Sequence, residues 1–181
     1  MKRLALTPVY GYKNAHKLKI ILDNSILKIG LEGIDNEELN TFIMKFEKKN
    51  LTKRTLGALI QNLLATGLII NKENYFHLTN SGREYYECLI NIESKLLKTF
   101  LKSITEKLEG MSVLIDLLFE KDSISFKKLI FNWRMVHKNP NWRNETTWNH
   151  QLDSRLQWLQ SMGIIRRVNQ NIIVLRKIII D

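Results

Sequence analysis

Apolar and polar residues alternate along the chain with the spacing of helices that bury one side. Apolar positions recur every three or four residues over 15–29 and again over 52–66, which predicts two amphipathic helices. Between them, Asp35 followed three residues later by Glu38 is typical of a helix start. We therefore expect a short helix between the other two, running to about Phe46.

The residues after the third helix predict a β-hairpin. Gly67 stands where a left-handed residue ends a helix, and the short apolar runs LIIN and YFHL follow it. Three polar residues, 72–74, join the two runs. The helical spacing returns near Asn80 and continues to about residue 108, so one long helix is expected there.

The second half of the chain repeats this order. A helix over 111–120 is expected to precede a second helix over 123–133, capped by Asp122 or Ser123. A third helix ends at Gly163, and two apolar runs after it form the second hairpin. When the two third helices are aligned on their terminal glycines, the apolar positions match without a gap.

Three helices followed by a hairpin is the arrangement of a winged-helix domain. We expect a mainly α-helical chain with short β-hairpins (α+β), made of two tandem winged-helix domains joined by a long helix. The expected parts are an N-terminal arm over 1–14, a first domain over 15–109 and a second over 110–181. The first domain includes the connecting helix at about 80–108.

The charge of the chain points to the kind of partner. The sequence has 28 Lys and Arg against 18 Asp and Glu, a formal net charge of +10, and both halves are basic. This balance favours a polyanion, with nucleic acid first and an anionic membrane surface second. A basic surface kept for solubility is the alternative.

The polar sides of the two third helices are the candidate DNA-contacting surfaces. A winged helix places its third helix in the major groove, so the side opposite the apolar stripe faces the bases. Arg143 suits guanine, and hydroxyl groups suit phosphate oxygens. Asp153 lies on the same side, although a carboxylate repels phosphate unless it accepts from cytosine. A solvent-exposed polar face is the alternative for both helices.

The hairpins are expected to contact the backbone or the minor groove. The turn of the second hairpin is the more basic, but Arg166 and Arg167 point to opposite sides of a strand, so only one is expected to reach DNA. The candidate DNA-binding residues are Lys53, Arg54, Gln61, Asn62, Lys72, Arg143, Thr146, Thr147, His150, Ser154, Arg166 and Arg167.

Tryptophans near basic residues can stack on bases or pack in a core. Trp133 and Trp148 are expected in the core, because their spacing fits the apolar stripes. Trp142 lies in a polar loop and is the best candidate for an exposed ring.

Catalytic patterns are not evident in the sequence. The four histidines are scattered, and there is no glycine-rich phosphate loop or nucleophile elbow. We therefore expect no enzyme activity, no metal and no cofactor. The one cysteine, Cys88, excludes an intramolecular disulfide and a cysteine-based zinc site, which is typical of a cytoplasmic protein. No secretory leader, transmembrane helix or membrane association is expected.

The chain contains, in order, NYFHLTNSGREYY, IESKLLKTFLKSI, VLIDLLFEKDSISFKKL, a loop with tryptophan, and LDSRLQWLQSMGIIRRVNQNIIVL. Over about residues 50–176 this order resembles the DNA-recognition region of FokI-like type IIS restriction endonucleases. That region is built from successive winged-helix-related subdomains, and the cleavage domain is separate from it. The resemblance implies a DNA-reading chain without the nuclease domain.

These patterns together predict non-catalytic, sequence-specific binding of double-stranded DNA, as a recognition module of a restriction system or a transcription regulator. The alternative is a protein–protein scaffold of tandem winged helices, such as a kleisin-binding subunit of an SMC-type complex. An enzyme with a nuclease site that the sequence does not reveal is a third hypothesis. The apolar run Ile178–Ile180 is expected to need a partner: a third strand position, another chain or a downstream domain such as a nuclease domain.

Overall fold

A computed structural model describes residues 15–47, 51–93 and 95–176. The described part is mainly helical with two small antiparallel sheets of three strands each, which confirms the expected α+β class. The expected arm at 1–14 and the run Ile178–Ile180 lie outside the described residues.

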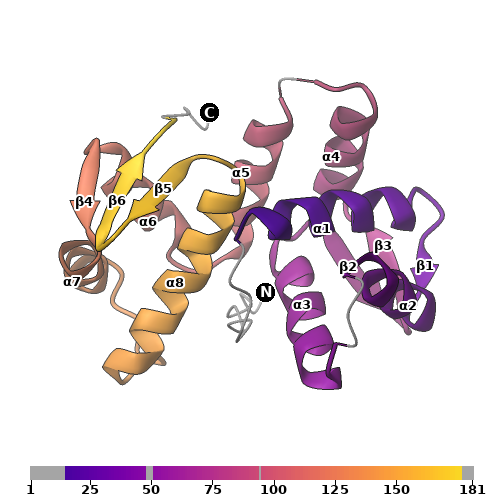
Figure 1. The fold of residues 1–181 in the computed structure, drawn as a ribbon, viewed down its shortest axis with the longest axis horizontal. Helices are drawn as coiled ribbons and strands as arrows, with labels where there is room; N and C mark the ends of the chain where they lie inside the picture. Colours follow the sequence, from indigo (N-terminus) through magenta and orange to yellow (C-terminus); the bar gives the residue numbers. More distant parts are fainter. Residues whose placement is uncertain (1–14, 48–50, 94, 177–181) are drawn as a thin grey trace.

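The two halves have the same order of elements (Figure 1). The first half consists of α1 (Ala15–Ile29), β1 (Ile34–Asp35), α2 (Asn36–Glu47), α3 (Lys53–Ala65), β2 (Ile69–Lys72) and β3 (Tyr75–Leu78). The second consists of α6 (Met111–Phe119), β4 (Ser123–Ser125), α7 (Phe126–Val136), α8 (Glu145–Ser161), β5 (Ile165–Val168) and β6 (Asn171–Val174). Between the halves lie α4 (Asn80–Ile90) and α5 (Leu96–Lys107).

Each expected hairpin is present and gains a third strand. The strand orders are β1-β3-β2 and β4-β6-β5, so the last strand of each half is the central one. Ile34 of β1 pairs with Phe76, and Ile124 of β4 pairs with Ile172. The two added strands are only two and three residues long, too short to give an alternating pattern in the sequence.

Local signals in the sequence set most helix ends. Asp35 Oδ1 accepts a hydrogen bond of 2.8 Å from Glu38 N at the start of α2, as expected. Gly67 and Gly163 follow their helices with φ of 74° and 69°, in the left-handed region that favours glycine. The expected cap of α7 needs correction: Ser125 caps this helix in place of Asp122 or Ser123, because residues 123–125 form β4.

The expected connecting helix is two helices. α4 ends at Ile90, and α5 turns back to lie beside it (Figure 1). Ile92 adopts φ of 54° in the turn. This reversal brings Phe100 against Tyr85, with ring centroids 6.3 Å apart, and against Trp158 of α8, at 5.6 Å. A continuous helix would carry Phe100 away from Tyr85, so burial of these rings explains the break.

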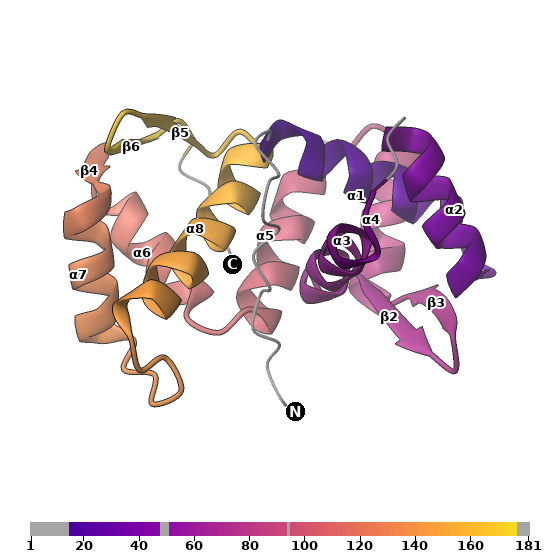
Figure 2. The same cartoon turned by 60° about the horizontal axis from the view of Figure 1, so that its bottom comes forward.

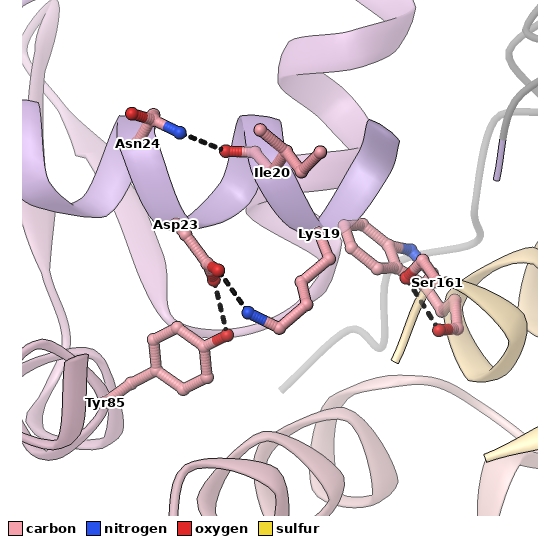
Figure 3. Close-up of polar contacts among 7 residues, drawn as sticks. Lys19, Ile20, Asp23, Asn24, Tyr85 and Ser161 are labelled. Carbon is pink, nitrogen blue, oxygen red and sulfur yellow. Dashed lines mark hydrogen bonds and ion pairs between the residues drawn. The ribbon is translucent and has the colours of Figure 1, made fainter. Parts of the chain in front are cut away.

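The two halves share one continuous hydrophobic core. Its link is α1, which lies against α8 of the second half and also against α4 (Figure 1). Figure 3 shows Asp23 of α1 accepting from both Lys19 and Tyr85, the latter over 2.7 Å. Burial, together with the nearby Asp23 carboxylate, raises the pKa of Tyr85, so its hydroxyl remains a hydrogen-bond donor at neutral pH.

Two helical glycines give a matched test of how closely α4 packs on the backbone at Leu68. A Cβ at Gly82 of α4 would collide with the carbonyl oxygen of Leu68, whereas a Cβ at Gly57 of α3 would meet no atom within 4 Å. We expect Gly82→Ala to lower the free energy of unfolding by about 1–3 kcal/mol through overpacking. Gly57→Ala should raise it by about 0.5–1 kcal/mol through helix propensity. Urea unfolding of both variants measures the difference, and equal effects would contradict the packing of α4 on Leu68.

Candidate nucleic-acid interface

One side of α3 faces solvent. Lys53, Gly57 and Gln61 are each separated by about one helical turn and are exposed, and Arg54 is exposed beside them. We call these four residues the α3 stripe. Because Gly57 has no side chain, the centre of the stripe is open to close approach by a large ligand.

Asn62 does not belong to this surface. Its side chain is only 5% exposed, and it lies on the buried side of α3 with Leu59 and Leu63. Ala65, one turn after Asn62 on α3, is 1% exposed. The buried side of α3 is therefore wider than the apolar stripe predicts. The expected outward position of Asn62 is wrong.

The β2–β3 hairpin projects beside α3 (Figure 2). Lys72 at the end of β2 is exposed, and Glu73 and Asn74 form the turn with φ of 50° and 69°. A groove next to the hairpin is lined in part by Lys72, Arg83 and Lys107, together with Glu106. The hairpin thus has a basic groove next to it, separate from the residues of the α3 stripe.

The polar side of α8 is mostly covered, contrary to expectation. Every residue from Thr147 to Ile165 is buried or half-buried, because α1 lies against this helix and Trp158 packs on Phe100 of α5. Ser154 is 5% exposed, and its hydroxyl donates to the carbonyl oxygen of His150 over 2.9 Å. The expected outward position of Ser154 is therefore corrected.

The start of α8 remains at the surface. Arg143 and Thr146 are exposed, while Thr147 and His150 are half-buried. The Asn144 side chain accepts from both the backbone nitrogen and the hydroxyl of Thr147, over 2.7 and 2.8 Å. The Thr147 hydroxyl is thus part of the helix cap, which leaves Arg143 and Thr146 as the accessible members of the expected set.

The two arginines of the second hairpin point in different directions, as expected for neighbours on a strand. Arg167 forms an ion pair with Asp153 of α8, and its guanidinium lies 5.5 Å from the centroid of the Phe126 ring. Arg166 is exposed. Asp153 therefore serves a structural ion pair, and Arg166 is the arginine of this hairpin that is open to solvent.

Trp142 is buried, which corrects its expected exposure. It is 6% exposed and belongs to a cluster with Trp133, Trp148 and His137. The ring centroids of Trp142 and Trp148 are 4.8 Å apart, and those of Trp133 and Trp142 are 5.2 Å apart. Because Trp142 is anchored in this cluster, the loop before α8 is held against the core, and Arg143 is fixed next to it at the surface.

A fully buried arginine completes the cluster. The Arg155 guanidinium lies 5.4 Å from the Trp133 ring centroid and 5.0 Å from that of Trp142. It donates to the Glu109 carbonyl oxygen from Nε over 3.1 Å and Nη2 over 2.7 Å, and from Nη1 to the backbone and side chain of Gln151. Burial lowers the pKa of Arg155 to about 9, so the group remains charged at neutral pH.

The burial of Arg155 could have been predicted from its position in the sequence. Arg155 lies three residues after Leu152 and four before Leu159, which is the spacing of a core position on this helix. A charged residue at such a position indicates a buried cation that needs acceptors.

The starts of α3 and α8 face the same side of the molecule. Both helices begin at the lower edge of Figure 1, the side that comes forward in Figure 2. Lys53 and Arg54 in the first turn of α3 and Arg143 just before α8 are exposed. The N-terminus of α3, whose first turn has no acidic residue, adds partial positive charge, whereas the first turn of α8 carries the exposed Glu145 beside Arg143.

Comparison of the chain with protein-family models, curated proteins and solved structures found no match in any of the three. Within the residues described, no group of three or more His, Cys, Asp or Glu side chains is placed to hold a metal ion. None of the described helices combines the length and the apolar character needed to cross a membrane.

The buried guanidinium leads to a stability test. We expect Arg155→Met to lower the free energy of unfolding by about 3 kcal/mol or more, because the Glu109 and Gln151 acceptors lose their charged donor inside the protein. Arg166→Met, at an exposed site, should change it by less than about 0.5 kcal/mol. Urea unfolding followed by tryptophan fluorescence measures both. An Arg155→Met protein as stable as the wild type would show that the guanidinium does not stabilise the junction.

Proposed function

We propose that this chain is a non-catalytic, sequence-specific double-stranded DNA-binding protein made of two winged-helix units. The observation that carries the proposal is that α3 and α8 begin on the same side of the molecule, with Lys53, Arg54 and Arg143 exposed at or next to these starts. A net charge of +10 supports a polyanionic ligand on this side.

The repeated topology supports the winged-helix interpretation. Each half has the order helix, strand, helix, helix, strand, strand, and each sheet has its last strand in the centre. In a winged-helix unit the third helix is the one that enters the major groove. These helices are α3 and α8, the two whose starts face the same side.

The two units contribute unequally in this proposal. α3 offers a stripe along most of its length, with Lys53 and Arg54 for phosphate oxygens and Gln61 for a base edge. α8 offers mainly its start, where we expect Arg143 to read guanine and Thr146 to contact phosphate, because the residues after Thr146 are buried or half-buried. Exposed Lys72 and Arg166 of the hairpins provide further backbone contacts.

The proposed role is a recognition module of a restriction system or a transcription regulator, acting in the cytoplasm. A scaffold that uses its helices to bind proteins is the alternative. The α3 stripe supports DNA over a scaffold, because it contains two cations, an amide and a glycine but no large apolar side chain.

The salt dependence of binding tests the phosphate contacts. We expect the affinity for a labelled 24-base-pair duplex, measured by fluorescence anisotropy, to fall steeply with salt, with a log–log slope of about −0.9 for each phosphate neutralised. Lys53→Ala and Arg54→Ala should each make the slope shallower by about 1. Lys102→Ala, which removes an exposed cation of α5, serves as the matched control and should leave the slope unchanged. A wild-type slope near zero would rule out the α3 stripe as the phosphate-binding surface. An equal change of slope in Lys53→Ala, Arg54→Ala and Lys102→Ala would do the same.

Arg143 and Arg166 should contribute differently to the preference for a DNA sequence. On a duplex selected from a random pool, we expect Arg143→Ala to cost about 1–3 kcal/mol of binding free energy and to relax preference at one base position. Arg166→Ala should weaken binding to all duplexes alike, because it contacts only the backbone in this proposal. Repeating the selection with each variant measures both effects. Unchanged preference with Arg143→Ala would remove the start of α8 from the base-reading surface.

A further inference from the structure

The outer side of α7 carries large apolar side chains that the fold leaves at the surface. Phe131 is 64% exposed and Met135 is 60% exposed, and they lie one helical turn apart on the same side. Leu129 and Trp133 on the opposite side are fully buried. Figure 1 shows α7 at one end of the long axis of the molecule, away from the first half.

Cations surround these two side chains. Lys127, Lys128 and Arg134 are exposed on α7, and Lys138 follows just beyond its end. The helix has the sequence FKKLIFNWRMV, which contains no acidic residue. The Arg134 guanidinium lies 5.7 Å from the centroid of the Trp148 ring, so its position at the edge of this side is defined. We call Lys127, Lys128, Phe131, Arg134, Met135 and Lys138 the α7 outer face.

We propose that the α7 outer face docks an acidic, amphipathic helix of a partner protein. Phe131 and Met135 form a ridge of the kind that packs against the apolar stripe of another helix. The four cations around the ridge are placed to pair with carboxylates that flank such a stripe. The inference does not depend on DNA binding, because α7 is not one of the two helices that begin on the proposed DNA-binding side.

The chemistry of the face separates this occupant from two others. A second copy of the chain would bring four cations against four cations, and like charges across an interface oppose association. A nucleic acid would satisfy the cations but would leave the Met135 side chain against a polar sugar–phosphate backbone. An acidic amphipathic helix satisfies both the charge and the apolar area.

A peptide selection tests the proposal without requiring the identity of the partner. The probe is a displayed library of random 16-residue peptides selected on the full chain. We expect the enriched peptides to carry Asp or Glu together with apolar residues at helical spacing. Their affinity should fall at least tenfold for Phe131→Ser and for Lys127→Glu/Lys128→Glu. The matched control is Tyr75→Ser, which changes an exposed aromatic residue of the β2–β3 hairpin and should leave the affinity unchanged.

Each other outcome would overturn the proposal. These outcomes are enriched peptides without acidic residues, binding that Phe131→Ser leaves intact, or no enrichment at all. Two further arms cover the other occupants. If a labelled single-stranded oligonucleotide binds more tightly than the selected peptides, and Phe131→Ser weakens that binding, the face stacks on bases. If the chain forms a concentration-dependent dimer that Phe131→Ser abolishes, the face is used for self-association. Because all these positions are exposed, the variants should keep the wild-type melting temperature, which circular dichroism checks.

Discussion

The arrangement of the second half depends on one buried guanidinium. Arg155 of α8 donates to the carbonyl oxygen of Glu109, in the segment where the chain passes from the first half to the second. The next residue, Gly110, has φ of 71° and accepts a 2.9 Å hydrogen bond from the Trp133 indole of α7. Two helices thus hold the same short segment through its backbone, and the cost of burying the charge is offset by donated hydrogen bonds and two aromatic rings. These contacts therefore tie α7 and α8 to the backbone that joins the two halves.

The second constraint is the packing of α1 on α8. It joins the first and last helices of the described chain into one core, in which the residues of α8 after Thr146 are buried or half-buried. A helix cannot both bury its full length between neighbours and present that length to a duplex. Packing against its neighbours reduces the exposed surface of α8. The same packing holds the starts of α3 and α8, which face the same side, in fixed positions relative to each other.

Local sequence signals predict the fold well, and tertiary packing accounts for the differences. The helix ends at Gly67 and Gly163 and the cap at Asp35 follow from backbone chemistry within a few residues. The break after Ile90 is not local, because it depends on Phe100 meeting rings from two other helices. For the candidate site, the sequence correctly predicts surface positions for Lys53, Arg54, Gln61, Lys72, Arg143, Thr146 and Arg166. It also predicts surface positions for Asn62, Ser154 and Trp142, which the structure shows to be buried. Those three lie on polar-looking segments that another element covers, which periodicity within one helix cannot reveal.

The tryptophan cluster relates the two proposed binding surfaces to each other. Arg143 follows the buried Trp142 in the chain, and the guanidinium of Arg134 on the α7 outer face lies 5.7 Å from the centroid of the Trp148 ring, which is itself 4.8 Å from the centroid of the Trp142 ring. Interiors packed at this density deform little, so the two surfaces keep a fixed geometry. A protein docked on α7 would then be held at a set distance and orientation from a duplex at the start of α8. The two proposals therefore assign the exposed cations to different ligands. On the α3 stripe they accompany polar groups and glycine, which suits a phosphate backbone, and on α7 they surround an apolar ridge, which suits a protein helix.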